Sequence, residues 1–196
     1  INSDTFHALI VEGFPGLGKS STIDLALAEC GVDAVAIGAY ATPLHIFNCI
    51  CRHPNSILIL DDVASVFSDP KAMAILKAAT WQSSGQANQS GSPDKPRARR
   101  VGWGSTSEKV EQTETNFSGK IILLTNSVPA GKETEAFLSR CLSYRIRMNE
   151  TDIRELLMEA AQNPSYFVDT DVANGVAKFL INKSAEIDLM KVSFRT

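Results

Sequence analysis

The feature that most constrains this chain is a glycine-rich stretch near its start, Gly13-Phe14-Pro15-Gly16-Leu17-Gly18-Lys19-Ser20-Ser21, which fits G-x-x-x-x-G-K-[ST] at every fixed position. An apolar run at 8–11 predicts a short buried strand before it, and apolar residues at helical spacing follow it over 22–29. Such glycines let backbone N–H groups close around phosphate oxygens, and the helix N-terminus adds positive charge. The alternative is a glycine turn that happens to precede a helix. The context favours a phosphate site, with Lys19 on the β- and γ-phosphates and the Ser20 hydroxyl on Mg²⁺.

Two further apolar runs end in polar side chains that suit the same site. The run 57–60 predicts a strand buried on both faces, as in a parallel sheet, and it is followed by Asp61 and Asp62. Because ligands bind beyond the carboxyl ends of such strands, we expect Asp61 to hold the Mg²⁺ shell and Asp62 to polarise an attacking water. A second buried strand over 120–125 ends in Asn126. Many strands end in aspartate, so the acidic pair indicates a metal and catalytic site mainly because a phosphate loop lies upstream of it.

Length, composition and charge bound the class of protein. With 196 residues, 44% of them hydrophobic, the chain has room for one domain with a real core plus a small second one. The formal net charge of −3 gives no overall argument for nucleic-acid binding and leaves only local basic patches. No run is long enough to span a membrane and no signal peptide is visible, so we expect a cytoplasmic protein with no membrane partner. Since the sequence starts at Ile1 and stops abruptly at Thr196, we also expect a piece of a longer protein.

Strands and helices alternate along the chain as far as residue 149. Further strands are expected at 35–37 and 144–148, and helices at 44–51, 71–79 and 136–142. The four cysteines lie in apolar or helical contexts without metal-ligand spacing, and we interpret them as reduced core thiols. This pattern predicts an α/β nucleotide-binding domain over 1–149.

The last part of the chain predicts a small helical lid over 150–196. Thr151 is expected to cap a helix over 152–161, and Asp169 or Thr170 a second helix that reaches 184. The second helix carries apolar residues on one face, namely Val172, Val176, Phe179 and Leu180.

Between the helix at 71–79 and the strand at 120–125 the composition changes. Residues 82–93 hold no core-forming side chain and predict a flexible loop, which opens an insert over about 82–118. The loop leads into a basic cluster with an adjacent aromatic ring, comprising Arg97, Arg99, Arg100 and Trp103. One interpretation is a solvated charged face. The other is a nucleic-acid contact in which the arginines meet phosphates and the ring stacks on a base, although acidic residues follow closely.

Together these residues resemble the AAA+ ATPases over nearly the whole chain. Gly13–Ser20 looks like the Walker A motif of that family, and Leu60-Asp61-Asp62 looks like Walker B. Asn126 stands where the family has sensor 1, Ser139-Arg140-Cys141 matches the arginine-finger position of clamp-loader subunits, and Phe194-Arg195-Thr196 is similar to the start of the sensor 2 helix. The Asp-Asp ending is similar to bacterial initiators and helicase loaders, and the basic insert to ATPases of phages and mobile elements. The chain stops at sensor 2, so the lid is shorter than the resemblance implies.

The resemblance implies a P-loop NTPase fold, in which a five-stranded parallel sheet of order 5-1-4-3-2 is flanked by helices. It implies ATP and Mg²⁺ as ligands, with Gly13–Ser21 and Arg195 on the nucleotide, and Ser20 and Asp61 on the metal. It places Asn126 between Lys19 and Asp62, where an amide can hold the attacking water.

The resemblance further implies that Arg140 completes the site of a neighbouring subunit in a ring, expected to be a hexamer. An arginine supplied in trans can be worth about 10³–10⁵ in rate, so a monomer is expected to bind ATP yet hydrolyse it poorly. Arg145 and Arg147 are rival fingers, but they lie in a strand pattern typical of surface residues.

Three functions are compatible with these residues. The first is an Mg²⁺-dependent ATPase motor or loader that works as a ring on DNA or a nucleoprotein complex. The second is a nucleotide-dependent switch or scaffold, in which turnover is incidental. The third is a small-molecule kinase, which the sensor 1 position, the finger position and the C-terminal lid disfavour. DNA-stimulated ATPase activity would favour the first over the second, and phosphate transfer to an acceptor other than water would favour the third.

Overall fold

The computed structural model describes residues 6–38, 40–62, 65–81, 98–104, 112–164, 167, 169–186 and 188–189. The chain divides into two compact units. The first comprises Ile1–Phe14 and Lys19–Arg145, and the second comprises Pro15–Gly18 and Ile146–Thr196.

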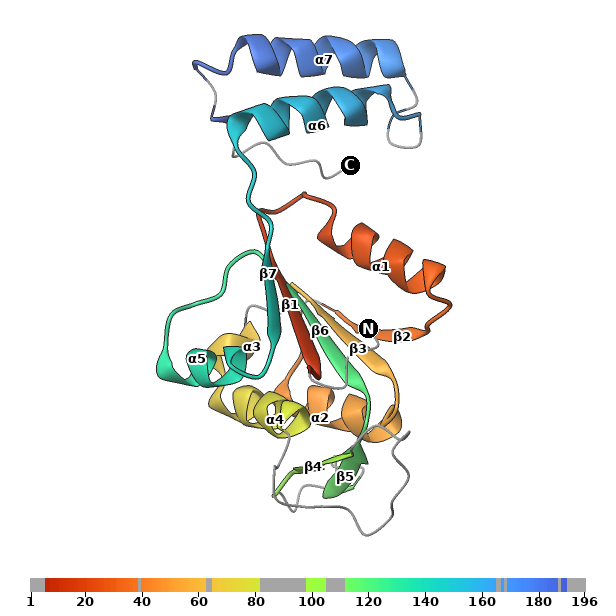
Figure 1. The fold of residues 1–196 in the computed structure, drawn as a ribbon, viewed down its shortest axis with the longest axis vertical. Coiled ribbons are helices and arrows are strands. Elements are labelled where there is room, and N and C mark those ends of the chain that lie inside the picture. Colours follow the sequence, from red (N-terminus) through yellow and green to blue (C-terminus); the bar gives the residue numbers. More distant parts are fainter. Residues whose placement is uncertain are drawn as a thin grey trace. The chain divides into compact units, whose positions relative to one another are not determined.

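A five-stranded parallel sheet organises the first unit, which confirms the predicted α/β class. From one edge to the other, its strands are β2 (Ala34–Ile37), β3 (Ile57–Asp61), β6 (Lys120–Thr125), β1 (Ala8–Glu12) and β7 (Leu142–Arg145) (Figure 1). Counted along the chain within this sheet alone, the order is 2-3-4-1-5, which is 5-1-4-3-2 read from the opposite edge. The strand labels differ from the expected numbering because β4 and β5 form a separate hairpin.

The apolar runs of the two central strands are buried on both faces, as expected of a parallel sheet. Every side chain of 57–60 in β3 and of 121–124 in β6 is buried. Alternate residues on one face join a single core with four helices, α2 (Pro43–Arg52), α3 (Ser65–Ser68), α4 (Pro70–Thr80) and α5 (Lys132–Leu138). Figure 1 shows these four helices grouped together and α1 (Lys19–Glu29) apart from them. The sheet therefore has one face that is firmly packed against these helices.

Side-chain caps fix where the core helices begin. The Thr42 hydroxyl accepts a hydrogen bond from the His45 N–H at 3.2 Å, and Pro43 opens α2. A carboxylate oxygen of Asp69 accepts from the Lys71 N–H at 2.8 Å, with Pro70 as the first residue of α4. Both helices therefore start one residue earlier than their apolar patterns indicated.

Two of the expected elements are shifted along the chain. The helix predicted over 136–142 occupies Lys132–Leu138, because its first turn is polar and because the three residues after Leu138 bond back to its last turn. The strand predicted over 144–148 occupies Leu142–Arg145. The short helix α3 was not predicted, since four residues give too little periodicity to detect.

Part of the basic insert is ordered, which corrects the expectation of a loop over its whole length. Strands β4 (Arg99–Gly102) and β5 (Glu114–Phe117) form an antiparallel hairpin. Val101 and Phe117 point from it into the main core and are fully buried. The predicted flexible stretch 82–93 lies outside the described residues.

The second unit contains two helices, α6 (Glu150–Gln162) and α7 (Thr170–Asn182). Asn149, not Thr151, caps α6, in a capping box with Asp152. Asp169 caps α7, as one of the two predicted alternatives.

The predicted apolar face of α7 is not the face buried in this unit. Ala173 and Ala177 are buried in the cluster that includes Ile153 and Leu157 of α6. By contrast, Val172, Val176 and Phe179 are exposed, and Leu180 is half-buried. Leu180 and Ile181 pack partly buried against the same cluster, whereas the other three predicted residues lie outside it.

All four cysteines are free thiols, but only Cys49 and Cys141 are buried. Cys51 is half-buried and Cys30 is exposed, which corrects the expectation of four core thiols. Among the described residues, none of the helices has the length and apolar character needed to cross a membrane.

Candidate functional site

The glycine loop joins β1 to α1, as its flanking patterns predicted. Gly16 and Gly18 have φ values of 79° and 70°, in the left-handed region that glycine enters at little cost. Helix α1 begins at Lys19, immediately after the second of them. The backbone path therefore explains Gly18, a fixed position of the motif, and Gly16, which stands at a variable position, and the first N–H groups of α1 follow directly on the loop.

Lys19 is held against the start of the loop and the end of β6. Its ammonium group donates to the carbonyl oxygens of Gly13 at 2.8 Å and Phe14 at 2.9 Å, and to Asn126 Oδ1 at 3.0 Å. The lysine that the sequence assigned to phosphate binding thus lies beside the residue assigned to sensor 1.

Ser20 and Asp61 come together from α1 and β3. The Ser20 hydroxyl donates to Asp61 Oδ2 at 2.7 Å. Magnesium is usually bound through one or two carboxylates together with substrate phosphates, and it prefers oxygen ligands. The hydroxyl and carboxylate therefore fit a Mg²⁺ ion shared with a nucleotide. Within the described residues, no group of three or more His, Cys, Asp or Glu side chains could hold a metal ion.

Asn126 lies between Lys19 and Asp62. Its Oδ1 accepts from Lys19, and its Nδ2 donates to Asp62 Oδ1 at 3.0 Å. Asp62 has φ 54°, a left-handed conformation that aspartate tolerates better than most residues, at a cost of order 1 kcal/mol. Its backbone N–H donates to Leu124 O at 3.0 Å, which ties the strained residue to β6. Backbone strain of this kind is characteristic of functional sites.

The sheet register explains why these residues meet. In the parallel ladder, Glu12 of β1 pairs with Thr125 of β6, and Asp61 of β3 pairs with Leu124. Because β6 lies between β1 and β3, the residues that follow each strand reach the same edge side by side. Side chains distant in sequence thereby become neighbours at the carboxyl ends of the strands, where open α/β sheets bind ligands.

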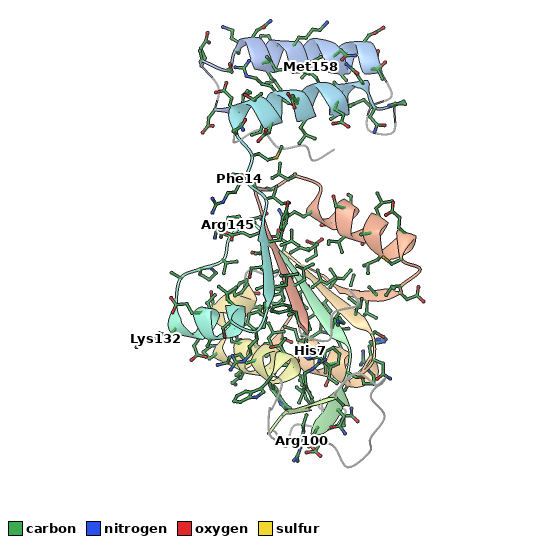
Figure 2. The ribbon with its side chains drawn as sticks, in the orientation of Figure 1. His7, Phe14, Arg100, Lys132, Arg145 and Met158 are labelled. Atoms are coloured by element: carbon green, nitrogen blue, oxygen red, sulfur yellow. The ribbon has the colours of Figure 1, made fainter. Side chains whose placement is uncertain are left out.

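An ion pair beside the loop was not predicted. Arg145, the last residue of β7, donates through Nε to Glu12 Oε2 at 2.8 Å, and Glu12 Oε1 accepts from the Val128 N–H at 3.4 Å. Figure 2 shows Arg145 near Phe14, at the loop end of the sheet. The two residues are register partners, so the pair becomes predictable only once β7 is placed beside β1. The contact engages Arg145, a rival finger candidate, within its own subunit.

The tripeptide Ser139-Arg140-Cys141 directly follows α5. The Ser139 hydroxyl donates to Ala136 O at 2.9 Å, Arg140 Nη1 donates to the same carbonyl, and the Cys141 thiol donates to Phe137 O at 3.2 Å. Burial raises the pKa of Cys141 to about 12 despite the positive charge of Arg140 next to it, so this thiol is not a nucleophile at neutral pH.

Arg140 does not reach the site of its own subunit. It comes just before β7, whose first residue Leu142 pairs with Leu9 of β1. Leu9 precedes Gly13 by four residues, which is roughly 13 Å of strand. Since the strands are parallel, Arg140 lies at the amino-terminal end of the strands, whereas the glycine loop follows the carboxyl end of β1.

The hairpin separates the residues proposed to contact nucleic acid. Arg99 is buried, with 4% of its surface exposed, and its guanidinium donates to Gly119 O and lies over the Phe117 ring. Trp103 packs on Phe47 with ring centroids 5.9 Å apart. These positions correct the idea of one exposed basic cluster, since Arg99 is buried and Trp103 is half-buried against the core.

Of the two arginines of the cluster that the structure describes, Arg100 is the one that faces solvent. It forms an ion pair with Glu114 of the partner strand. Figure 2 shows Arg100 at the opposite end of the first unit from Phe14 of the glycine loop. Arg97, and Arg195 of the expected sensor 2, lie outside the described residues.

Comparison with protein-family models finds no match for this chain, and comparison with curated proteins finds none either.

Proposed function

We propose that this protein is an Mg²⁺-dependent ATPase of the AAA+ type, with a P-loop NTPase fold. The observation that carries the proposal is the position of Asn126, which joins Lys19 to Asp62 at the edge of the sheet where Ser20 meets Asp61. A cation, a metal-ligand pair, a polar amide and a second carboxylate therefore converge beside a loop that requires glycine at two positions. This is the set of groups that phosphoryl transfer to water needs.

Each residue has a chemical task in this proposal. Lys19 binds the β- and γ-phosphates, and it can do so by exchanging its carbonyl contacts with the loop for phosphate oxygens. Ser20 and Asp61 hold Mg²⁺, which neutralises phosphate charge when bound. Asp62 accepts a proton from the attacking water, and Asn126 orients that water while touching the γ-phosphate.

Arg140 provides the argument for assembly. It lies at the amino-terminal end of the strands, whereas its own glycine loop follows the carboxyl end of β1, so its charge cannot act on the nucleotide of its own subunit without a large movement. An arginine in the site of a second copy would stabilise charge on the transferred phosphoryl group. The proposed active form is therefore a ring, and the resemblance to AAA+ proteins suggests a hexamer.

The same observation favours a second candidate, a nucleotide-dependent switch or scaffold. A subunit whose finger lies away from its own site would hold ATP without rapid turnover, so ATP could stabilise an assembly. In both cases DNA as a partner rests on the resemblance, because the hairpin does not gather its basic residues on one surface.

The test is the specific ATPase rate as a function of protein concentration, with and without DNA. The proposed ATPase predicts a rate per subunit that rises as the protein assembles and then levels off. A further rise with DNA supports a motor or loader, and assembly with ATP but without turnover supports the scaffold. A rate per subunit that is independent of concentration over the range where assembly occurs would reject the shared site.

A further inference from the structure

The corner between α4 and α5 carries an aromatic contact that the proposed site does not explain. Trp81 directly follows α4, and its side chain is 55% exposed. The guanidinium of Arg140 lies over its ring, with Cζ 5.1 Å from the ring centroid. We propose that Trp81 is a positioning residue for Arg140, holding the guanidinium at this corner so that it can enter the nucleotide site of a second copy of the chain. This inference rests on the proposed ATPase function.

The helices on both sides of the contact are anchored in the core by buried side chains. On α4, the Thr80 hydroxyl donates to Leu76 O at 2.8 Å, and Leu76 is fully buried. On α5, Phe137 is fully buried three residues before Arg140. Two firmly packed helices therefore bring the ring and the guanidinium together, and the ion pair of Lys77 and Glu133 joins the same two helices at a second place, one turn before Trp81 on α4.

The stack leaves the arginine able to bind an anion. A guanidinium has five N–H donors in its plane, and stacking on a ring uses the face of that plane instead. In the described part of the chain, the hydrogen bond of the Arg140 side chain is the one from Nη1 to Ala136 O. The ring and this carbonyl thus limit the orientations of the side chain while the other donors stay available for phosphate oxygens.

A plain packing role for Trp81 makes different predictions from a positioning role. If the ring only covers the side of α5, an aliphatic residue of similar size should serve as well. If the ring orients the guanidinium through its π face, Trp81→Phe should retain most of the function and Trp81→Leu should not. ATP affinity should be unchanged in both variants, because the contact is remote from Lys19, Ser20 and Asp61.

The experiment places the Trp81 substitution in the subunit that donates the finger. Lys19→Ala subunits keep an intact finger, and Arg140→Ala subunits keep an intact glycine loop, so the mixture should regain ATPase activity. The donor is then replaced by Lys19→Ala/Trp81→Leu or by Lys19→Ala/Trp81→Phe. Binding of a fluorescent ATP analogue, thermal unfolding and co-assembly are measured for every variant.

We expect the Trp81→Leu donor to lower the recovered kcat by roughly two- to fivefold, the change in population that an exposed cation–π contact supports. The Trp81→Phe donor should stay within about twofold of the original donor. Equal activity with the Leu and Phe donors would overturn the positioning role, as would a loss seen only when Trp81→Leu is placed in the subunit that carries the intact loop. If the original mixture stays inactive although the subunits co-assemble, the proposed trans site itself fails, which the reference mixture shows before any Trp81 variant is tested.

Discussion

The glycine-loop site and the basic hairpin show opposite relations between distance in sequence and distance in space. Lys19, Asp62 and Asn126 are far apart along the chain, yet hydrogen bonds of 3.0 Å join them. Arg99 and Arg100 are adjacent, yet one is buried against Phe117 and the other faces solvent. The parallel register brings strand ends to one edge, whereas the alternation of a strand sends neighbouring side chains to opposite faces.

This difference teaches how each kind of motif should be interpreted. A set of residues that each follow a buried strand predicts a site, because the sheet dictates where strand ends meet. A run of charged residues predicts a charged surface only when the local structure is known. In a β-strand such as β4, successive side chains point to opposite faces, so only part of the run is exposed.

Lys19→Ala tests the proposed nucleotide site most directly. Loss of the ammonium group removes charge-assisted hydrogen bonds to phosphate, each worth about 1.5–3 kcal/mol, so ATP with Mg²⁺ should bind roughly a thousandfold more weakly. Lys120→Ala is the matched control, since Lys120 begins β6 at the opposite end of the strand from Asn126. Calorimetric titration measures both variants. Equal affinities for Lys19→Ala and the wild type would remove the phosphate assignment.

Asp62→Asn separates turnover from binding. Asparagine also tolerates the left-handed backbone of this position, and its Oδ1 can still accept from Asn126, so the fold of the site should persist. It cannot take a proton from water, and kcat should fall by about 10²–10⁴. ATP affinity should change by less than about threefold. A phosphate-release assay at saturating ATP measures the loss, and turnover near that of the wild type would mean that another carboxylate acts as the base.

Arg99→Met tests the buried half of the basic cluster through stability. Burial lowers the pKa of Arg99 to about 10, and within the part of the chain that the structure describes its Nε and Nη1 have no hydrogen-bond partner. Because the folded pKa is below the unfolded value, the charge destabilises the folded state below pH 10, and this cost fades as the pH rises through 10. Replacing a buried charge by an apolar residue should therefore raise the free energy of unfolding by about 1–2 kcal/mol at pH 7.

Urea unfolding at pH 7 and at pH 10.5 measures this gain, which should shrink at the higher pH. Arg100→Met is the control on the adjacent exposed position, and it should alter the free energy of unfolding by less than about 0.5 kcal/mol. A destabilised Arg99→Met with a neutral Arg100→Met would show that the Phe117 stack and the Gly119 contact outweigh the cost of burial.

The apolar runs predicted the parallel sheet and the residues at the carboxyl ends of its strands, because buried parallel strands leave a strong local pattern, whereas the expected strand order came from the resemblance to AAA+ ATPases. The apolar runs of β3 and β6 and the glycines at 16 and 18 are each determined by their own segment. Three other features are not determined by a single segment: the hairpin, the pair of Glu12 with Arg145, and the stack of Arg140 on Trp81. Each depends on a partner from another segment, and no local periodicity identifies that partner.

Arg100 carries the last and smallest prediction, which concerns DNA. Three arginines acting together would have flattened the salt dependence of DNA binding by up to about three units of slope, whereas one exposed arginine accounts for about 0.7–0.9. If the hairpin contacts DNA, Arg100→Ala should lower the slope by that single unit, and Glu114→Gln should raise affinity slightly because it frees Arg100 from its ion pair. Arg99→Met should leave the slope unchanged, since its guanidinium is buried. Fluorescence anisotropy over a salt series measures the slope for all three variants.

A change of three units when Arg97, Arg99 and Arg100 are neutralised together would mean that Arg99 leaves the core to bind DNA. An unchanged slope in every variant would identify the hairpin as a solvated charged face. In that last case the residues around the glycine loop converge on a site, whereas the hairpin binds no phosphate.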